Sequence, residues 1–327
     1  IMKKVLLAIA AVATITSCSQ NEEFENPAQK AEIGFNTAVT RATELTTSGL
    51  QTAGFKIYAY NTGNSGMTSA ITLPSSAWID DVAEYSKSES AWSIKNGTYY
   101  WPLTDKLQFF AYSPTGGVTY NVPNGTDAGY PKFTYQVATN ASDQKDLVIA
   151  SAQDKVKNAD GVTSPVSLTF KHALTQINIQ VVQESTDYTY TIEKVKVIDV
   201  KGKGTFEYTG VNTGSWTTDE AETNTEYEYT LGTFADGTSA VVSDNALMLI
   251  PQDITNAKIS IKYKTEKGGS SIFNDTKEIA LPTTPAWNFG KKITYKLTLS
   301  VGEGIKVEGT ADESWSSTEP SDTPVEG

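Results

Sequence analysis

Apolar and polar residues alternate with a period of two along most of this chain. Near the N-terminus, Ile33, Phe35 and Val39 lie on one side of such a segment, and small or polar residues lie on the other. This period is typical of β-strands that bury one face. Turn-forming Gly, Asn, Asp and Pro separate the segments. The pattern predicts strands at residues 33–39, 55–60, 107–112, 166–170, 177–181, 188–192, 195–200, 246–250, 259–263 and 293–299.

These strands predict an all-β protein built from antiparallel sandwiches, because alternation implies sheets with one buried and one wet face. Between Ile192 and Val195 the apolar positions shift by one residue, which predicts a β-bulge or a short break. No window after the N-terminal segment keeps helical spacing over several turns. A repeat of fixed short period is also missing from the sequence, which disfavours a solenoid or a propeller.

The chain of 327 residues is long enough for two domains. The best boundary is the Asn-, Asp-, Gly- and Pro-containing segment at residues 158–165. We therefore expect an N-terminal β-sandwich domain over residues 31–160 and a C-terminal β-sandwich domain over residues 165–315.

The first 17 residues have the layout of a signal peptide. Two lysines precede an apolar run at residues 5–15, and two small residues follow it. Cys18, the only cysteine, comes next, and this arrangement resembles the bacterial lipobox, in which the thiol is acylated. An ordinary signal peptide cut after residues 11–13 is the alternative. The apolar run is too short for a spanning helix, so membrane contact is expected only through the lipid on Cys18.

Polar segments flank the two predicted domains. Residues 18–30 are acidic and contain a proline, which predicts a flexible tether. Residues 316–327 are polar and proline-bearing, which predicts a mobile tail. Arg41, the only arginine, directly follows the first predicted strand. From composition alone, a functional arginine and an ordinary surface cation are equally supported.

Composition excludes several function classes. The net charge of −12 disfavours nucleic-acid binding, which needs a basic surface. One cysteine cannot form an internal disulfide. His172 is the only histidine, so an ordinary zinc site cannot be built and a Ser-His-Asp site has no supporting Gly-x-Ser-x-Gly motif. We expect His172 to be a packed or capping residue, and we expect no catalytic residue, metal or cofactor.

The six tryptophans allow two interpretations. Aromatic rings can act as stacking platforms for sugars, or they can fill the core beside strands, and we favour the core because several tryptophans adjoin predicted strands. These residues are Trp78, Trp92, Trp101, Trp216, Trp287 and Trp315.

Several phrases of the sequence together resemble the fimbrillin family, whose members are subunits of type V pili. Their order and spacing extend over most of the chain. They are YYWP at residues 99–102, FFAYSP at 109–114, DLVIA at 146–150, FKHAL at 170–174, LMLIPQ at 247–252 and WNFGKKITY at 287–295. The resemblance implies two transthyretin-like β-sandwich domains in tandem, export as a lipoprotein, and assembly with other pilin subunits outside the cell.

The resemblance also implies a role for the arginine. In the family, an arginine-directed protease cuts after an N-terminal strand, and a strand from a neighbouring subunit fills the groove that the cut opens. The expected cut lies between Arg41 and Ala42, and the removable strand would carry Ile33, Phe35 and Val39. An open groove exposes strand edges and apolar surface that an added strand would cover.

The donor strand is harder to place, because the polar tail lacks alternation. We expect contributions from Leu297, Leu299, Ile305 and Val307.

We therefore predict a non-enzymatic structural subunit of a surface fimbrium that supports adhesion to an unidentified receptor. The alternative is a lipoprotein that stays anchored in the outer membrane and binds glycans through exposed tryptophans without polymerising. A glycosidase, which needs only two suitably spaced carboxylates, has no support beyond the abundance of acidic residues.

Overall fold

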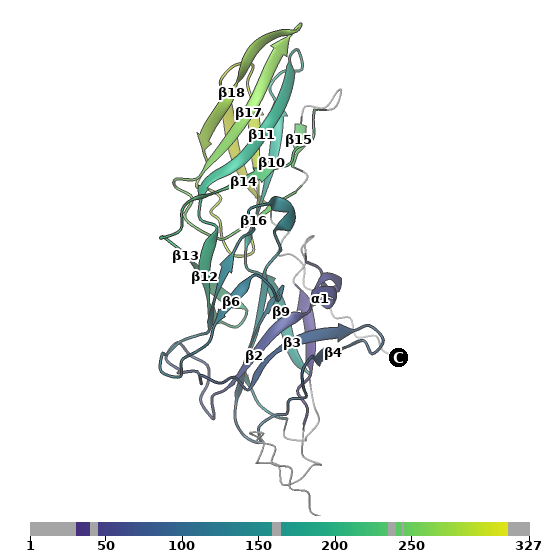
Figure 1. Cartoon of the computed structure of the whole chain (residues 1–327), viewed down its shortest axis with the longest axis vertical. Helices are drawn as coiled ribbons and strands as arrows, with labels where there is room; N and C mark the ends of the chain where they lie inside the picture. The colour runs from purple at the N-terminus through teal and green to yellow at the C-terminus, as the bar shows by residue number, and fades with distance from the viewer. Residues whose placement is uncertain (1–30, 40–44, 159–164, 235–239, 244, 313–327) are drawn as a thin grey trace, which may run out of the picture.

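The computed structural model describes residues 31–39, 45–158, 165–234, 240–243 and 245–312. Within these ranges the regular structure is almost entirely β-strand, which confirms the all-β prediction. Four sheets pair into two sandwich-like halves, and the molecule is elongated (Figure 1). The predicted signal peptide, tether and tail lie outside the described residues.

The first sheet has seven strands and contains the N-terminal strand at one edge. Its order is β1-β9-β8-β5-β2-β3-β4. The strands are β1 (Phe35–Val39), β2 (Phe55–Asn61), β3 (Ile79–Ser86), β4 (Ala91–Ile94), β5 (Leu107–Ser113), β8 (Val148–Lys155) and β9 (Val166–His172).

The central strand β5 of this sheet is buried on both faces, contrary to the expectation of one wet face, whereas the edge strands β1 and β4 keep exposed residues on one face. Every residue of β5 is buried. Phe109 packs into a cluster on one face, whereas Phe110 and Tyr112 pack into a second cluster on the other. The apolar run at residues 107–112 is nearly continuous, and such runs belong to strands that are covered on both sides.

The second sheet covers one face of the first and combines strands from distant parts of the chain. Its order is β13-β12-β7-β6. Aromatic rings fill the space between the two sheets, with ring centroids 5.0 Å apart for Phe110 and Tyr208 and 5.4 Å for Tyr112 and Phe133. The strands are β6 (Val118–Asn121), β7 (Lys132–Gln136), β12 (Lys203–Gly210) and β13 (Thr213–Thr218).

The third and fourth sheets form the other half of the molecule. In the third, β15 (Ala240–Val242), β10 (Thr175–Gln183), β19 (Lys292–Leu299) and β20 (Ile305–Asp312) lie side by side, and β16 (Leu247–Leu249) also pairs with β10. In the fourth, the order is β14 (Thr225–Tyr229), β11 (Thr189–Val200), β17 (Lys258–Lys267) and β18 (Ser270–Ala280). The register of β11 against β17 shifts between Ile192 and Lys194, which confirms the predicted bulge.

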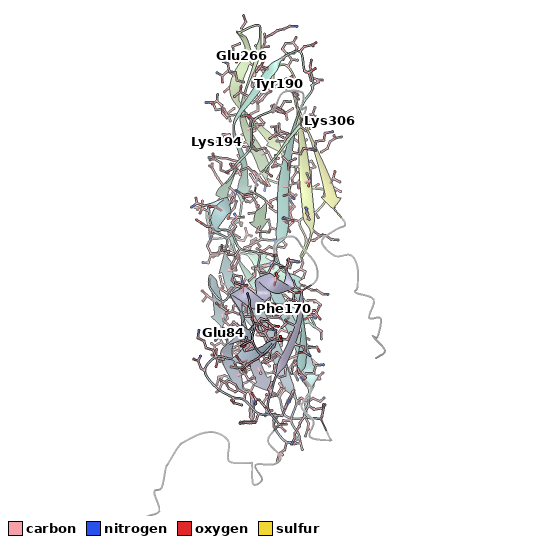
Figure 2. All side chains as sticks on the ribbon, turned by 90° about the vertical axis from the view of Figure 1, so that its right-hand side faces the viewer. Glu84, Phe170, Tyr190, Lys194, Glu266 and Lys306 are labelled. Carbon is pink, nitrogen blue, oxygen red and sulfur yellow. The ribbon has the colours of Figure 1, made fainter. Side chains whose placement is uncertain are left out.

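Charged residues cover the solvent face of the fourth sheet. Lys194 pairs with Glu228 across β11 and β14 at 3.3 Å, and Lys264 pairs with Glu266 on β17 at 2.6 Å. Figure 2 shows Lys194 and Glu266 toward the end of the molecule opposite to Phe170. Exposed ion pairs of this kind add little stability. Their position shows that this face of the sheet is exposed to solvent, as the alternation of apolar and polar residues predicts.

Two strand pairings are parallel, although the sequence predicted antiparallel sheets. β1 runs parallel to β9, and β10 runs parallel to β19. Alternation shows that a strand buries one face, but it carries no information on the direction of the neighbouring strand. Both pairings join segments far apart in the sequence, where no hairpin fixes the direction.

The predicted boundary segment at residues 158–165 does not coincide with a change of sheet. β9 follows that segment, yet it pairs with β1 and β8 in the first sheet. β12 and β13 also belong to the first half, because β12 pairs with β7. A turn-rich composition predicts a break between strands but not a change of domain, and the next described strand, β9, lies in the first half of the molecule.

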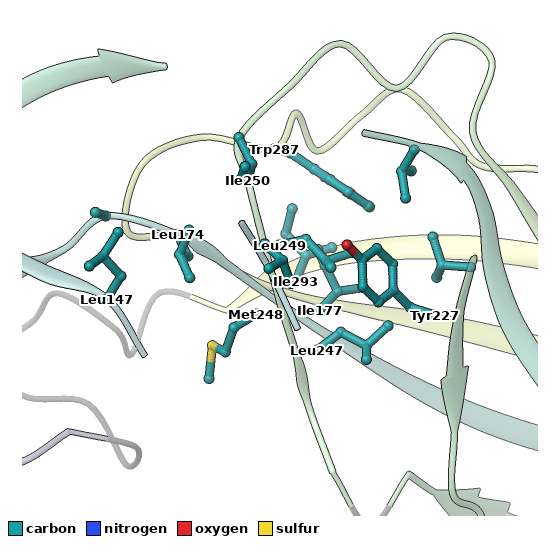
Figure 3. Close-up of a cluster of buried hydrophobic side chains, with 14 of the residues drawn as sticks. Leu147, Leu174, Ile177, Tyr227, Leu247, Met248, Leu249, Ile250, Trp287 and Ile293 are labelled. Carbon is teal, nitrogen blue, oxygen red and sulfur yellow. The ribbon is translucent and has the colours of Figure 1, made fainter. Parts of the chain in front are cut away.

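A single apolar cluster continues through the junction of the two halves. Leu147 and Leu174 from the first half pack with Ile177, Leu249 and Trp287 from the second (Figure 3). All five side chains are buried. The halves therefore share one core and have no polar boundary at this place.

In the described part of the chain, two short helical segments, α1 and η2, interrupt the strands. α1 (Thr47–Ala53) is capped by Thr46, whose Oγ1 accepts from the Gly49 N–H at 3.2 Å. Leu50 is its buried residue, and Gly54 ends it with a φ of 69°. η2 (Ala141–Asp143) is a single turn. With one buried residue, α1 has too little periodicity to be detected from the sequence.

Buried tyrosines predict a loss of stability in alkali. Burial raises the pKa of Tyr60 and the pKa of Tyr135 to about 12. The unfolded chain loses these protons near a pH of about 10, so the free energy of unfolding should fall as the pH rises from there to about 12. Denaturant titrations across this interval measure the effect, and Tyr60→Phe should make it smaller, while Tyr135 keeps its contribution. A free energy of unfolding that stays constant over the interval would contradict this expectation.

Candidate functional site

The N-terminal strand β1 and the groove that it fills form the candidate site. β1 lies at the edge of the first sheet, in register with β9 from Phe35 opposite Val166 to Val39 opposite Phe170. The Val166 N–H donates to the Gly34 carbonyl oxygen at 2.8 Å. One edge of β1 is therefore bound to the sheet along its whole length.

The buried face of β1 completes an aromatic cluster. Ile33, Phe35 and Val39 are 3%, 4% and 8% exposed. The Phe35 ring meets Phe55 and Phe109 edge-on, with centroids 5.9 and 6.1 Å away. Without β1, these two rings would lose their cover, and the groove would be lined by apolar residues of β2, β5 and β9.

Three further hydrogen bonds hold β1 and the residues just before it from the other side. The Ile33 N–H donates to the Tyr99 carbonyl oxygen, and the Trp101 N–H donates to the Ala31 carbonyl oxygen, both at 2.9 Å. The Trp92 Nε1–H on β4 donates to Thr37 Oγ1 at 3.0 Å. β4 is the opposite edge of the same sheet, so the sheet curves until its two edge strands meet.

These contacts were not found from the sequence. The alternation at residues 33–39 indicated the buried side of β1, but neither Trp92 nor the 99–101 segment lies near it in the chain. The sequence identifies Trp92 only as one of six tryptophans that could fill the core or stack on a sugar. No local signal marks a hydrogen bond between two sheet edges.

The predicted processing and lipidation residues lie outside the described residues. Arg41 and Ala42 fall between the end of β1 at Val39 and Leu45, just before α1. Cys18 precedes the first described residue. The chain order thus puts the only arginine in the segment that links β1 to the body of the protein.

The four predicted donor residues divide into two groups. Leu297 and Leu299 are fully buried on β19, which is paired on both sides by β10 and β20. Ile305 and Val307 lie on β20, are half-buried, and pack against the core. Among described residues β20 pairs only with β19, so β20 can leave the sheet with far less disruption than β19.

His172 is 2% exposed, and its Nδ1 lies 2.7 Å from Asp146 Oδ2. The ring is packed where β9 meets β8. The described residues contain no group of three His, Cys, Asp or Glu placed to hold a metal ion. In the same part of the chain, no helix has the length and apolarity to cross a membrane.

The tryptophans do not share one environment. Trp101 and Trp287 are buried, Trp78, Trp92 and Trp216 are partly buried, and Trp315 lies outside the described residues. Trp92 and Trp101 belong to the groove of β1, and Trp287 belongs to the junction of the halves.

Comparison with known proteins places the chain in a family. A family model described as fimbrillin-like matches residues 40–315, beginning directly after β1. The chain belongs to the fimbrillin-like family. This family consists of structural fimbrial subunits and is not an enzyme family.

Individual relatives agree with the family assignment. The fimbrillin-like chain is 31% identical to fimbrium subunit Fim1C of Phocaeicola vulgatus, over 99% of both proteins. Crystal structures of putative cell adhesion proteins from Bacteroides uniformis and Bacteroides ovatus share the fold, each with a TM-score of 0.51. The Bacteroides uniformis protein is 14% identical, and the match covers 88% of this chain and 99% of that protein. The Bacteroides ovatus protein is 17% identical, and the match covers 85% of this chain and 95% of that protein.

Proposed function

We propose that this protein is a structural subunit of a type V fimbrium that assembles by donor-strand exchange. It is exported with a signal peptide as an outer-membrane lipoprotein acylated at Cys18. A protease then cuts between Arg41 and Ala42, and the mature subunit polymerises at the cell surface with other pilin subunits. The resulting fimbrium supports adhesion.

The observation that carries the proposal is the way β1 is attached. Its apolar side chains fill a groove in the first sheet, while the chain between it and α1 contains the only arginine. A single cut there leaves β1 held by non-covalent contacts alone. Loss of β1 would expose the edge of β9 and the rings of Phe55 and Phe109, and an incoming strand would cover both.

The incoming strand is assigned to β20 of a neighbouring subunit. Ile305 and Val307 have the same spacing as Ile33 and Phe35, so they present two apolar side chains to one face. β20 is bound on one edge only among the described residues. Residues Leu297 and Leu299 remain in the core of their own subunit.

Mass spectrometry of the protein from cells that make it tests the maturation step. The proposal expects an N-terminus at Ala42 in surface fimbriae and an acylated Cys18 in the membrane precursor. Multimer ladders that survive mild detergent but collapse on boiling would accompany the mature form. A product that is uniformly full-length and acylated, without multimers, would contradict the proposal and favour a permanently anchored lipoprotein.

A further inference from the structure

A second cavity lies on the first half of the molecule, beside the groove of β1 but distinct from it. Its volume is about 430 Å³. It lies between the end of β2, the loop that leads into β3, and the segment after β4. Six of its lining residues carry the argument below: Asn61, Ser76, Trp78, Thr98, Tyr99 and Tyr100.

The aromatic walls of this cavity are fixed in place. The Trp78 Nε1–H donates to the Tyr100 carbonyl oxygen at 3.0 Å, and the Trp78 backbone N–H donates to the Ala59 carbonyl oxygen at 2.7 Å. The Tyr99 carbonyl accepts from the Ile33 N–H at 2.9 Å. Trp78, Tyr99 and Tyr100 each remain partly exposed. The Trp78 ring and the backbones of Tyr99 and Tyr100 are thus held by hydrogen bonds, and the three aromatic residues keep part of their surface exposed.

The polar groups of the cavity keep unused hydrogen-bonding capacity. Asn61 donates once to Asp105 and accepts once from the Gly63 N–H, which leaves one amide N–H and one lone pair. The side chains of Ser76 and Thr98 are exposed and form no hydrogen bond with another described residue. No charged residue lines the cavity.

The aromatic, polar and uncharged lining of the cavity indicates which class of ligand it can bind. An anionic ligand would meet no cation here, on a chain whose net charge is −12. A wholly apolar ligand would cover Asn61 and the hydroxyl groups without pairing them. A neutral sugar has a C–H face that packs on an aromatic ring and hydroxyl groups that pair with an amide or with Ser and Thr. The volume lies at the low end for small-molecule sites and fits roughly one or two sugar rings.

We propose that this cavity binds a neutral saccharide unit of a larger glycan. Every residue that lines the cavity lies after Arg41, so all of them stay in the subunit after a cut there. The Trp78 hydrogen bond to Tyr100 would also stay, whereas the Ile33 contact with Tyr99 would leave with β1. The site would give the subunit a means of adhesion along its side.

The test uses the full uncut chain and a panel of oligosaccharides. The neutral members are built from glucose, galactose, mannose and xylose, and oligogalacturonate serves as the acidic member. Calorimetry and tryptophan fluorescence should detect at least one neutral oligosaccharide with a Kd on the order of 1 mM or below. Absence of binding by every neutral member, or binding of the acidic member alone, would overturn the assignment.

Three variants locate the binding. Thr98→Trp fills the cavity from an exposed position, and Trp78→Ala removes one wall, so each should weaken binding at least tenfold. Thr126→Trp places the same new ring on an exposed loop outside the cavity and should leave binding unchanged. If Trp78→Ala does not fold, the result for Thr98→Trp alone tests the proposal. Unchanged binding by Thr98→Trp would overturn it.

Discussion

An Arg41→Ala variant is expected to accumulate as an uncut precursor that keeps Cys18 and forms no fimbrial polymer. The reason is that the protein offers an arginine-directed protease no second arginine. As long as the chain between β1 and α1 is intact, β1 stays tethered to its groove at a high effective concentration, and a strand from another subunit cannot compete. Intact mass and detergent-resistant ladders measure the two effects.

Two neighbouring changes sharpen this experiment. Arg41→Lys keeps the positive charge and should also block maturation, because an arginine-directed protease recognises the planar guanidinium group, which the lysine side chain lacks. Thr40→Ala leaves the arginine in place and should mature normally. Polymer formation by Arg41→Ala at the level of the unchanged protein would contradict a cut at this position.

A Phe35→Ala variant is expected to lower the free energy of unfolding of the uncut chain by about 3–5 kcal/mol, the usual cost of removing a buried phenylalanine. Phe35 is 4% exposed and meets both Phe55 and Phe109, so the truncation opens a cavity that β1 cannot close. Denaturant unfolding of purified protein measures the loss. Asn36→Ala, on the exposed side of the same strand, should change stability by no more than about 0.5 kcal/mol.

The same variant should also speed the release of β1 after the cut. In the nicked protein the peptide stays bound through its contacts with the groove, and Phe35 supplies the largest apolar one. Exchange of this strand for a synthetic peptide of residues 31–39 should therefore be faster in Phe35→Ala than in Asn36→Ala. Equal unfolding midpoints and equal exchange rates in the two variants would show that the buried face of β1 does not hold the strand.

Local pattern predicted about half of the strands and predicted none of their distant partners. The predicted segments fall on β1, β2, β5, β9, β10, β11, β16, β17 and β19, whereas the other described strands, β3, β12 and β20 among them, were not predicted. The alternation at residues 55–60 and 293–299 reflects whether a side chain faces the core, which is a property of each strand alone. That β9 returns to the first sheet, or that β12 pairs with β7, depends on which distant surfaces complement each other. The residue pattern within β9 or β12 does not indicate which distant strand each of them pairs with.

At the candidate site, too, the sequence predicted which residues of one strand are buried but not which residues they contact. Ile33, Phe35 and Val39 could be placed on one face from spacing, and all three are buried. The rings of Phe55 and Phe109 and the indole of Trp92 could not be assigned to that face, because they come from three other strands. The segments around Leu297 and Ile305 show the same alternation of apolar and polar residues. Only the strand pairing shows that β19 lies inside its sheet and that β20 lies at the edge.

The shared cluster at Leu147, Leu174 and Trp287 has a mechanical consequence. A hinge between two domains needs a boundary with few contacts, and apolar side chains are packed across this one. The halves of a subunit therefore resist bending relative to each other. A filament made of such units yields under tension where one copy meets the next, and each copy moves as a stiff segment.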